Sequence, residues 1–203
     1  MGQLMKWILA SASPRRSDIL RNLGMRFVVD PSGVAEPERV KGESPSSYAV
    51  RVARLKASNV AQRRRSGIVI AADTIVVAGD RILGKPADRG EASAMLARLA
   101  GRWHEVISGV SLVECGTLRS RSTHSRTRVH FRRLSAAEIV WYLDSGEYRD
   151  KAGAYGAQGL ASLFIDRIDG CFFNVVGFPV AAFEQLCRKM GIELTGQLQR
   201  RSR

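Results

Sequence analysis

Cysteine and histidine are scarce in this chain, and long hydrophobic runs are missing. Cys115, Cys171 and Cys187 lie far apart without CxxC spacing, so neither a disulfide framework nor a zinc ribbon is indicated. The histidines are also scattered, and we interpret His104, His124 and His130 as structural residues. The first apolar run, residues 7–10, is too short for a signal peptide core or a membrane span. These absences predict a protein of the reducing cytoplasm that has no membrane anchor.

The charge balance is strongly positive. The 203 residues include 32 Lys and Arg but only 19 Asp and Glu, which gives a formal net charge of +13. Such an excess favours a polyanionic partner, and nucleic acid, phosphorylated small molecules and anionic membranes all qualify. The alternative is that much of the excess forms a solvated arginine-rich surface. With 45% hydrophobic and 25% charged residues, the composition is that of a globular protein, and we expect one compact unit.

Short strand-like runs alternate with longer helix-like stretches, which predicts an α/β fold. The expected strands are 6–10, 27–29, 68–77, 105–113, 127–131 and 163–168. The expected helices are 14–23, 46–63, one from Asp88 to about Leu99, one from Ser135 with a capping box to Glu138, and 179–190. The polar segment 116–126 is expected to be a loop. Residues 1–194 are expected to form one domain, with a division into two lobes left open, and 195–203 a frayed basic tail.

A serine- and arginine-rich segment, residues 11–16, lies between the first expected strand and the first expected helix. Ser13 suits the N-cap and Pro14 the first helical position. Arg15 and Arg16 then fall in the first turn, where the positive end of the helix dipole disfavours them. A bound phosphate would remove this conflict, because backbone N–H groups, two hydroxyls and two guanidinium groups would converge on it. Two alternatives stay open: the arginines extend into solvent, or Ser-Pro-Arg-Arg is a kinase target.

A carboxylate interrupts the apolar run 68–77. An ionised Asp73 in a buried strand is costly, so it needs a partner, a metal ion or exposure at a strand end. Asp73 is therefore a candidate base or metal ligand, and the alternative is a turn or bulge carboxylate bonded to backbone N–H groups. Downstream, Lys85 stands in a stiff Gly-Lys-Pro loop where a fixed ammonium suits a phosphate, although a lone lysine is more often a surface residue.

The segment 147–159 combines charged residues with three glycines in its last seven positions. The glycines permit close approach of the backbone to a ligand, and Asp150 and Lys151 add a carboxylate and an ammonium. Gln158 offers both a donor and an acceptor, which reading the edge of a nucleobase requires. The alternative is an ordinary glycine-rich turn, since no GxxxxGK[ST] motif is present.

Together these groups predict metal-assisted phosphate chemistry, because no Ser-His-Asp set and no metal-spaced histidine pair accompanies them. The rival hypothesis is a basic nucleic-acid-binding module. That rival predicts aromatic residues interleaved with Lys and Arg on a strand face, or a basic helix with groove geometry, and the sequence shows neither. Nucleic acid binding is therefore not expected.

From about Ile8 to Gly191, the chain resembles the Maf proteins, also called septum-formation-inhibitor-like nucleotide pyrophosphatases. The matching segments are LASASPRR at 9–16, ADT at 72–74, KP at 85–86, LAGRWH at 99–104, DKAGAY at 150–155 and NVVGFP at 174–179. The resemblance implies a central mixed twisted sheet flanked by helices with a deep cleft, similar to inosine triphosphatases. It also implies a homodimer and hydrolysis between the α and β phosphates with Mg²⁺ or Mn²⁺. The family's historical name suggests a second rival, a non-enzymatic regulator of cell division.

By the same resemblance, Asp73 is the proton acceptor, and Glu36 and Asp73 lie near the metal. The positions that the resemblance assigns to the triphosphate are Ser11, Arg16, Lys56 and Lys85. The branch of the family acting on dTTP and UTP is similar to this chain at Arg15, Thr74 and Gln158, and Asp150 and Lys151 complete the expected substrate-binding set. The chain departs from the family at Phe178, where Leu is usual, and at Ala35, a position that can be acidic. The Arg-rich segment 118–133 and the basic tail are not explained by the resemblance.

Overall fold

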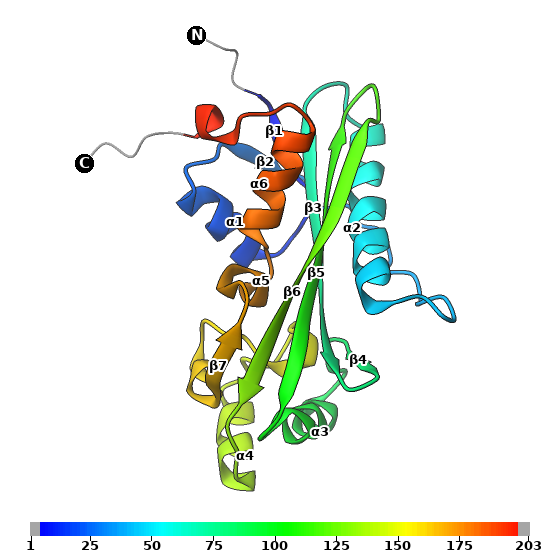
Figure 1. Ribbon diagram of the computed structural model, residues 1–203. Helices are drawn as coiled ribbons and strands as arrows, with labels where there is room; N and C mark the ends of the chain where they lie inside the picture. Colours follow the sequence, from blue (N-terminus) through cyan, green and yellow to red (C-terminus); the bar gives the residue numbers. More distant parts are fainter. Residues whose placement is uncertain (1–4, 199–203) are drawn as a thin grey trace, which may run out of the picture. The chain divides into compact units, whose positions relative to one another are not determined.

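The computed structural model describes residues 5–198 (Figure 1). The strands are β1 (Trp7–Leu9), β2 (Phe27–Val29), β3 (Ile68–Ala78), β4 (Arg81–Leu83), β5 (Trp103–Glu114), β6 (Ser120–Phe131) and β7 (Ile165–Asp169). The α-helices are α1 (Pro14–Asn22), α2 (Pro45–Gln62), α3 (Arg89–Leu99), α4 (Ala136–Asp144), α5 (Phe172–Val176) and α6 (Val180–Lys189). Three short 3₁₀ helices are η1 (Ala152–Ala154), η2 (Leu160–Phe164) and η3 (Leu194–Gln197). No helix among residues 5–198 is both long and apolar enough to cross a membrane.

The sheet is mixed, which confirms the predicted α/β class. Its strand order is β2-β1-β3-β5-β6-β7, and β4 pairs with β3 outside this path. β1 runs parallel to both β2 and β3, whereas β4 is antiparallel to β3 and β7 is antiparallel to β6. The β3–β4 connection is a tight turn, with Gly79 at φ 61° and Ala78 paired with Arg81.

Three sequence expectations were wrong. Residues 120–126 form the first half of β6 rather than a loop, because pairing with β5 fixes their backbone although their side chains are polar. Residues 163 and 164 end the η2 turn, so the last strand starts at Ile165. The tail begins ordered, since residues 194–197 form η3 and the Gln197 amide oxygen accepts a bond of 2.8 Å from the Met5 N–H. The rest of the predicted tail, 199–203, lies outside the described residues.

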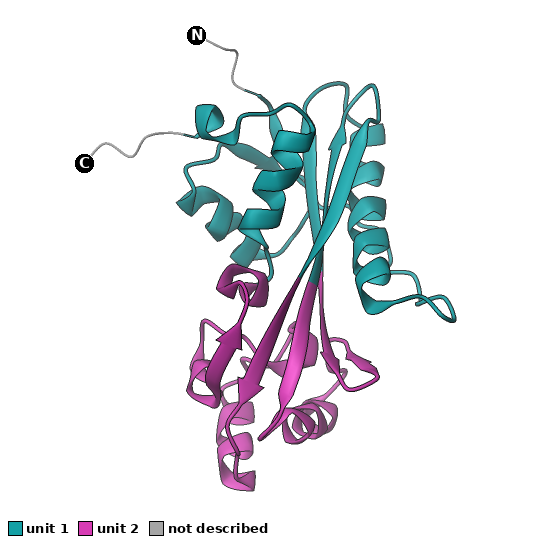
Figure 2. Cartoon of the chain, viewed as in Figure 1, with its two compact units in different colours: residues 1–73, 108–125, 177–203 teal, residues 74–107, 126–176 magenta. Residues whose placement is uncertain are grey.

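The chain divides into two compact units (Figure 2). Unit 1 comprises residues 1–73, 108–125 and 177–203, and unit 2 comprises residues 74–107 and 126–176. The strands β3, β5 and β6 each pass from one unit into the other along the chain. Asp73 is the last residue of unit 1 on β3, and Thr74 is the first residue of unit 2.

In unit 1, helix α2 lies directly against β5. The buried Ala57, Val60 and Ala61 of α2 join a cluster with Val69 of β3 and Val113 of β5. At Gly109 of β5 the approach is so close that an added Cβ would stand 2.2 Å from the backbone oxygen of Ala49. A glycine is therefore needed at this position, because it allows the short distance between β5 and α2, the helix that carries Lys56.

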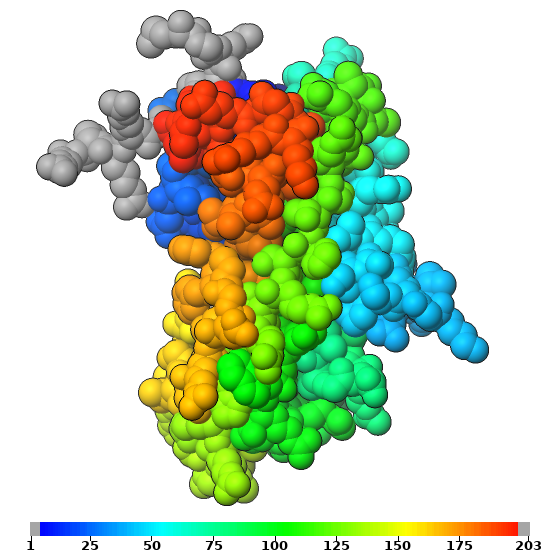
Figure 3. All heavy atoms as spheres, in the orientation of Figure 1, coloured from blue at the N-terminus to red at the C-terminus, as the bar shows by residue number. Residues whose placement is uncertain are grey.

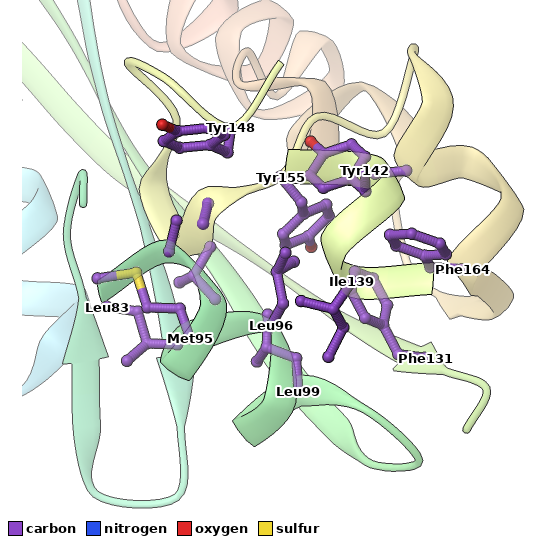
Figure 4. Packing of buried hydrophobic residues seen from close by; sticks show 14 of the residues in the cluster. Leu83, Met95, Leu96, Leu99, Phe131, Ile139, Tyr142, Tyr148, Tyr155 and Phe164 are labelled. Carbon is purple, nitrogen blue, oxygen red and sulfur yellow. The ribbon is translucent and has the colours of Figure 1, made fainter. Parts of the chain in front are cut away.

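Unit 2 has its own core between the sheet and helices α3 and α4 (Figure 4). The aromatic residues Phe131, Tyr155 and Phe164 meet there edge to face, at centroid distances of 4.8 and 6.0 Å. His104 is buried among them, with its Nε2 2.8 Å from the Tyr155 hydroxyl. Burial lowers the pKa of His104 to about 4, partly opposed by the backbone carbonyl of Arg102, so the ring is neutral at pH 7. The structural role expected for His104 is confirmed, and the pair anchors the segment that leads to Gln158.

The contact at Gly109 predicts a steric loss of stability. Gly109→Ala places a methyl group against the backbone of Ala49, which cannot rotate away as a side chain can, so α2 must shift. We expect the free energy of unfolding, measured by urea denaturation, to fall by about 1–3 kcal/mol or more. Gly196→Ala is the matched control, because an added Cβ there meets nothing within 4 Å. Equal stabilities for the two variants would show that α2 has more clearance than described.

The neutral, buried His104 predicts an acid-sensitive core. Its pKa in the folded chain is about 4, below the ordinary 6.5, so the unfolded chain binds the proton first as the pH falls. Its contribution to stability is complete above pH 6.5 and is lost progressively between pH 6.5 and 4. We expect the free energy of unfolding to fall more between pH 7 and 5 in the wild type than in His104→Gln. The exposed His124→Gln serves as control and should follow the wild type; identical slopes for all three proteins would contradict the assignment.

Candidate functional site

The junction of β1 and α1 holds the first group of the site. Pro14 occupies the first turn of α1 as expected, and Ser13 is the N-cap by position. The expected cap bond from the Ser13 side chain is absent, and instead the Ser11 hydroxyl accepts a hydrogen bond of 3.2 Å from the Ser13 N–H. Its oxygen also accepts from Arg16 Nη1 at 3.1 Å. The first turn contains no acidic residue, so the helix terminus keeps its preference for an anion.

Arg16 is held by the chain rather than extended into solvent. Its Nε donates to the carbonyl oxygen of Gly177 at 3.0 Å, and Nη1 donates to Ser11. Burial lowers the pKa of Arg16; the negative charge of Asp73 opposes this effect, Arg15 adds to it, and Glu36 opposes it. An arginine remains charged despite such a shift. The guanidinium group is therefore a fixed positive charge beside two carboxylates, which rules out the solvated alternative for Arg16.

Lys56 links the two predicted acidic residues. From α2, its Nζ donates to Glu36 Oε1 at 2.6 Å and to Asp73 Oδ1 at 2.7 Å. The Asp73 side chain is only 7% exposed and that of Lys56 13%, whereas Glu36 is 52% exposed. Asp73 thus has the charged partner that a carboxylate in a buried strand requires. The alternative that backbone N–H groups of a turn satisfy it is wrong, because β3 is continuous through position 73.

Tyr48 is a residue of this region that the sequence reasoning did not single out. It precedes Lys56 on α2 by eight residues, which places both on one face of the helix. Arg51 covers its ring at 5.4 Å and is bonded to both carboxylate oxygens of Glu43 at 2.8 Å. Burial raises the pKa of Tyr48, and the negative charges of Asp73 and Glu36 raise it further, so its hydroxyl stays protonated and can donate.

In unit 2, Thr74 lies on β3, and the other predicted residues lie in the loop after β4 or in the segment 147–160. The Gly153 N–H donates to the Gly84 carbonyl oxygen at 3.0 Å, which ties this segment to the loop that carries Lys85. Lys151 Nζ donates to the backbone oxygen of Glu147, and its stem lies so close to Gly156 that an added Cβ would come within 2.7 Å of it.

Two glycines of the segment 147–160 let charged side chains pack closely against the backbone. Gly159 faces the Glu147 carboxylate, which accepts a bond of 3.0 Å from the Leu160 N–H, and an added Cβ on Gly159 would stand 2.1 Å from its oxygen. These contacts are made with side chains of the same segment, so the alternative of an ordinary glycine-rich turn stays open.

The structure brings together five of the predicted residues within unit 1, and Arg15 lies beside them. These five are Ser11, Arg16, Glu36, Lys56 and Asp73. The other predicted residues belong to unit 2: Thr74, Lys85, Asp150, Lys151 and Gln158. Lys85, Asp150 and Gln158 are exposed there, and Asp150 has a positive φ of 59°, uncommon for a non-glycine residue.

The carboxylates of unit 1 fit a hard divalent cation that is shared with a ligand. Among residues 5–198 no group of three or more His, Cys, Asp or Glu side chains is placed to hold a metal ion. Glu36 and Asp73 supply two carboxylates around one lysine. Magnesium in proteins is often held by one or two carboxylates together with substrate phosphates and water, so this donor set suits it only when phosphate is bound.

The residues that sequence reasoning missed act through the backbone or through burial. Gly177 contributes its carbonyl oxygen, and Gly109 contributes its lack of a side chain. Asn174, which is fully buried, donates to the Val106 carbonyl at 2.9 Å and to the Thr127 hydroxyl at 3.0 Å. The segment NVVG at 174–177 was part of the resemblance, and that match was the only sequence signal that marked it.

Comparison with known proteins identifies the family. The sequence profile of the family described as Maf-like protein matches residues 6–190. The chain is 46% identical to a dTTP/UTP pyrophosphatase of Desulforamulus reducens over 92% of its own length and 97% of that protein. It is 46% identical to a dTTP/UTP pyrophosphatase of Syntrophomonas wolfei, over 92% and 98%. A solved HAM1 protein of Coxiella burnetii has a TM-score of 0.45 at 17% identity, covering 93% of this chain and 99% of that one. With the profile matched along most of its length, the chain belongs to the Maf family.

Proposed function

We propose that the chain hydrolyses dTTP and UTP to the nucleoside monophosphate and pyrophosphate. The observation that carries the proposal is the cluster of unit 1, in which two fixed cations and a hydroxyl stand beside a buried carboxylate. Relatives of nearly equal length that bear the name dTTP/UTP pyrophosphatase support the substrate class. The high positive charge is consistent with a polyanionic substrate.

The reaction is an attack of water on the α-phosphorus. A P–O bond forms to the water oxygen, the bond from the α-phosphorus to the bridging oxygen of the β-phosphate breaks, and pyrophosphate leaves. We assign the acceptance of the water's proton to Asp73, the buried carboxylate of this cluster. Ser11, Arg16 and Lys56 offer hydrogen-bond donors that neutralise charge on the phosphate oxygens.

We further propose that Glu36 and Asp73 hold a divalent cation, Mg²⁺ or Mn²⁺. When bound, such an ion supplies Lewis-acid stabilisation of charge on the phosphate oxygens. Lys56 lies between the two carboxylates and its ammonium offsets one of their two negative charges. The cation therefore competes with the Lys56 ammonium for the same oxygens.

The residues of unit 2 are proposed to hold the remainder of the nucleotide. Lys85 and Lys151 are cations suited to phosphate. Arg15 and Thr74 stand at positions where this chain resembles the branch of the family that acts on dTTP and UTP. Gln158 is exposed, so its amide is accessible to a base. An amide can donate to the O4 atom of uracil or thymine and accept from N3–H, a pair of groups that both bases share. The homodimer and the cytoplasmic location implied by the resemblance stay predictions.

A panel assay separates this proposal from its rivals. The purified chain is incubated with the eight common nucleoside triphosphates and Mg²⁺ or Mn²⁺, and release of pyrophosphate is followed. Preferred cleavage of dTTP and UTP is the expected result. A protein that releases no pyrophosphate but retains oligonucleotides in a filter-binding test is the nucleic-acid-binding alternative. A protein that does neither fits the non-enzymatic regulator.

Asp73→Asn tests the proposed base. The amide has the same size and can still accept a bond from Lys56, but it cannot take up the proton, so we expect kcat to fall by about 10²–10⁴-fold with the melting temperature little changed. Asp80→Asn, in the exposed β3–β4 turn, is the matched control and should keep full activity. If Asp73→Asn retains turnover within about tenfold of the wild type, Asp73 is not an essential base.

Gln158→Glu tests the reading of the base. The carboxylate keeps the size of the side chain but loses its donor, so kcat/KM for dTTP and UTP should fall by about 10- to 100-fold. Any residual CTP turnover should fall less, because cytosine presents an amino donor at the same edge. Gln185→Glu changes an exposed glutamine of α6 in the same way and should have no effect. Similar kcat/KM values of the wild type for all eight triphosphates would refute the role given to Gln158.

A further inference from the structure

The Arg-rich segment 118–133, which the family resemblance leaves unexplained, places a row of cations on the outer face of the unit 2 sheet. Along β6, Thr127, Val129 and Phe131 are buried, so the alternate residues Arg126 and Arg128 point to the opposite face. β6 and β7 lie side by side at the surface of unit 2 (Figures 1 and 3). This outer face is distinct from the core between the sheet and helices α3 and α4.

An aromatic ring from the neighbouring strand lies among these cations. Trp103, at the start of β5, alternates with the buried His104 and is 38% exposed. The Arg128 guanidinium carbon lies 4.6 Å from the centroid of its ring, and the His130 ring lies 5.2 Å away. The sequence shows no strand that interleaves aromatic and basic residues, but pairing of β5 with β6 creates this arrangement from residues 25 positions apart.

The two arginines are only loosely engaged by acidic neighbours. Arg126 Nη1 lies 3.4 Å from Glu105 Oε1, and Arg128 Nη1 lies 3.8 Å from Asp169 Oδ2. A charge-assisted hydrogen bond is about 2.7–2.9 Å long, so these pairs are weak, and both arginine side chains are more than half exposed. A phosphate with several strong acceptor oxygens can displace such partners.

The ring and Arg128 line an open depression with a volume of about 320 Å³. The other residues of its lining are Val77, Gly79, His104 and Glu105. This volume is at the lower end of the range typical of small-molecule sites, so it suits one base rather than a chain of stacked bases. The depression therefore combines a stacking surface, a partly apolar wall and nearby cations.

We propose that this face is a second nucleotide-binding site, separate from the cluster of Ser11, Arg16 and Asp73. The base stacks on Trp103, and the phosphate is bound by Arg126 and Arg128. Base–aromatic stacking tolerates different bases, because every base has a π-face, so the site takes nucleotides as a class rather than one base. The occupant is a free nucleotide, because Trp103 is the only Trp, Tyr or Phe among the described residues that line the depression. The proposal does not depend on the activity proposed above.

Equilibrium dialysis with labelled UMP, which the proposed hydrolysis leaves intact, measures the number of sites per chain. The wild type should bind one nucleotide more than Trp103→Ala, and Arg128→Gln should weaken that site by about tenfold. Trp141→Ala removes another exposed tryptophan, on α4, and should bind as the wild type does. Glu105→Gln should tighten the site, because Arg126 then loses its competing acidic partner. dTTP turnover of Trp103→Ala should equal that of the wild type, as a check that the fold is intact.

The number of bound UMP molecules per chain distinguishes the possible results. A difference of one site between the wild type and Trp103→Ala supports the proposal even if UMP does not bind to the unit 1 cluster, in which case the counts are one and none. Identical site numbers and Kd values for wild type, Trp103→Ala and Arg128→Gln overturn it. A ten-nucleotide single-stranded oligouridylate that binds at this face while UMP does not also overturns it, because the face would then serve a nucleic acid strand.

Discussion

The need to neutralise a carboxylate inside an apolar strand governs the site of this protein. Asp73 is nearly enclosed, and an unpaired charge there would cost several kcal/mol. Lys56 supplies the compensating charge from α2, and Glu36 shares it from the loop before that helix. Three segments distant in sequence must therefore meet, and the close contact of α2 with β5 at Gly109 sets where the lysine stands. The side chains that meet there, Ser11, Arg16 and Lys56, are also donors suited to a phosphate.

Much of this fold was predictable from local patterns. Asp88 and Ser135 cap their helices through the expected side-chain bonds, and the bounds of α1 and α2 agree with the sequence to within one residue. Such signals are local, because a cap or an apolar face depends on residues within one or two turns. The first half of β6 was missed for the opposite reason: its side chains are polar, and only hydrogen bonding to the neighbouring β5 makes it a strand.

Part of the candidate site could also be predicted from local sequence patterns. Asp73 could be identified because a charge in an apolar run is anomalous, and Arg16 because a cation at a helix N-terminus is unfavourable. Neither anomaly tells which residue resolves it. Gly177 contributes a backbone carbonyl, which every residue possesses, and Gly109 contributes by having no side chain. Neither contribution can be recognised from the residue type alone. The Trp103 and Arg128 pair likewise depends on strand pairing, which the sequence alone did not define.

The contact at Gly109 also limits how the site can respond to a ligand. Because the backbone of α2 rests directly against β5 at Gly109, the helix cannot move closer to the sheet at that point. Lys56 can leave the carboxylate by rotating its own four-carbon stem, with its Cα in place. Exchange of the ammonium for another cation then requires a change of the Lys56 side-chain rotamer, and the backbone of α2 keeps its position.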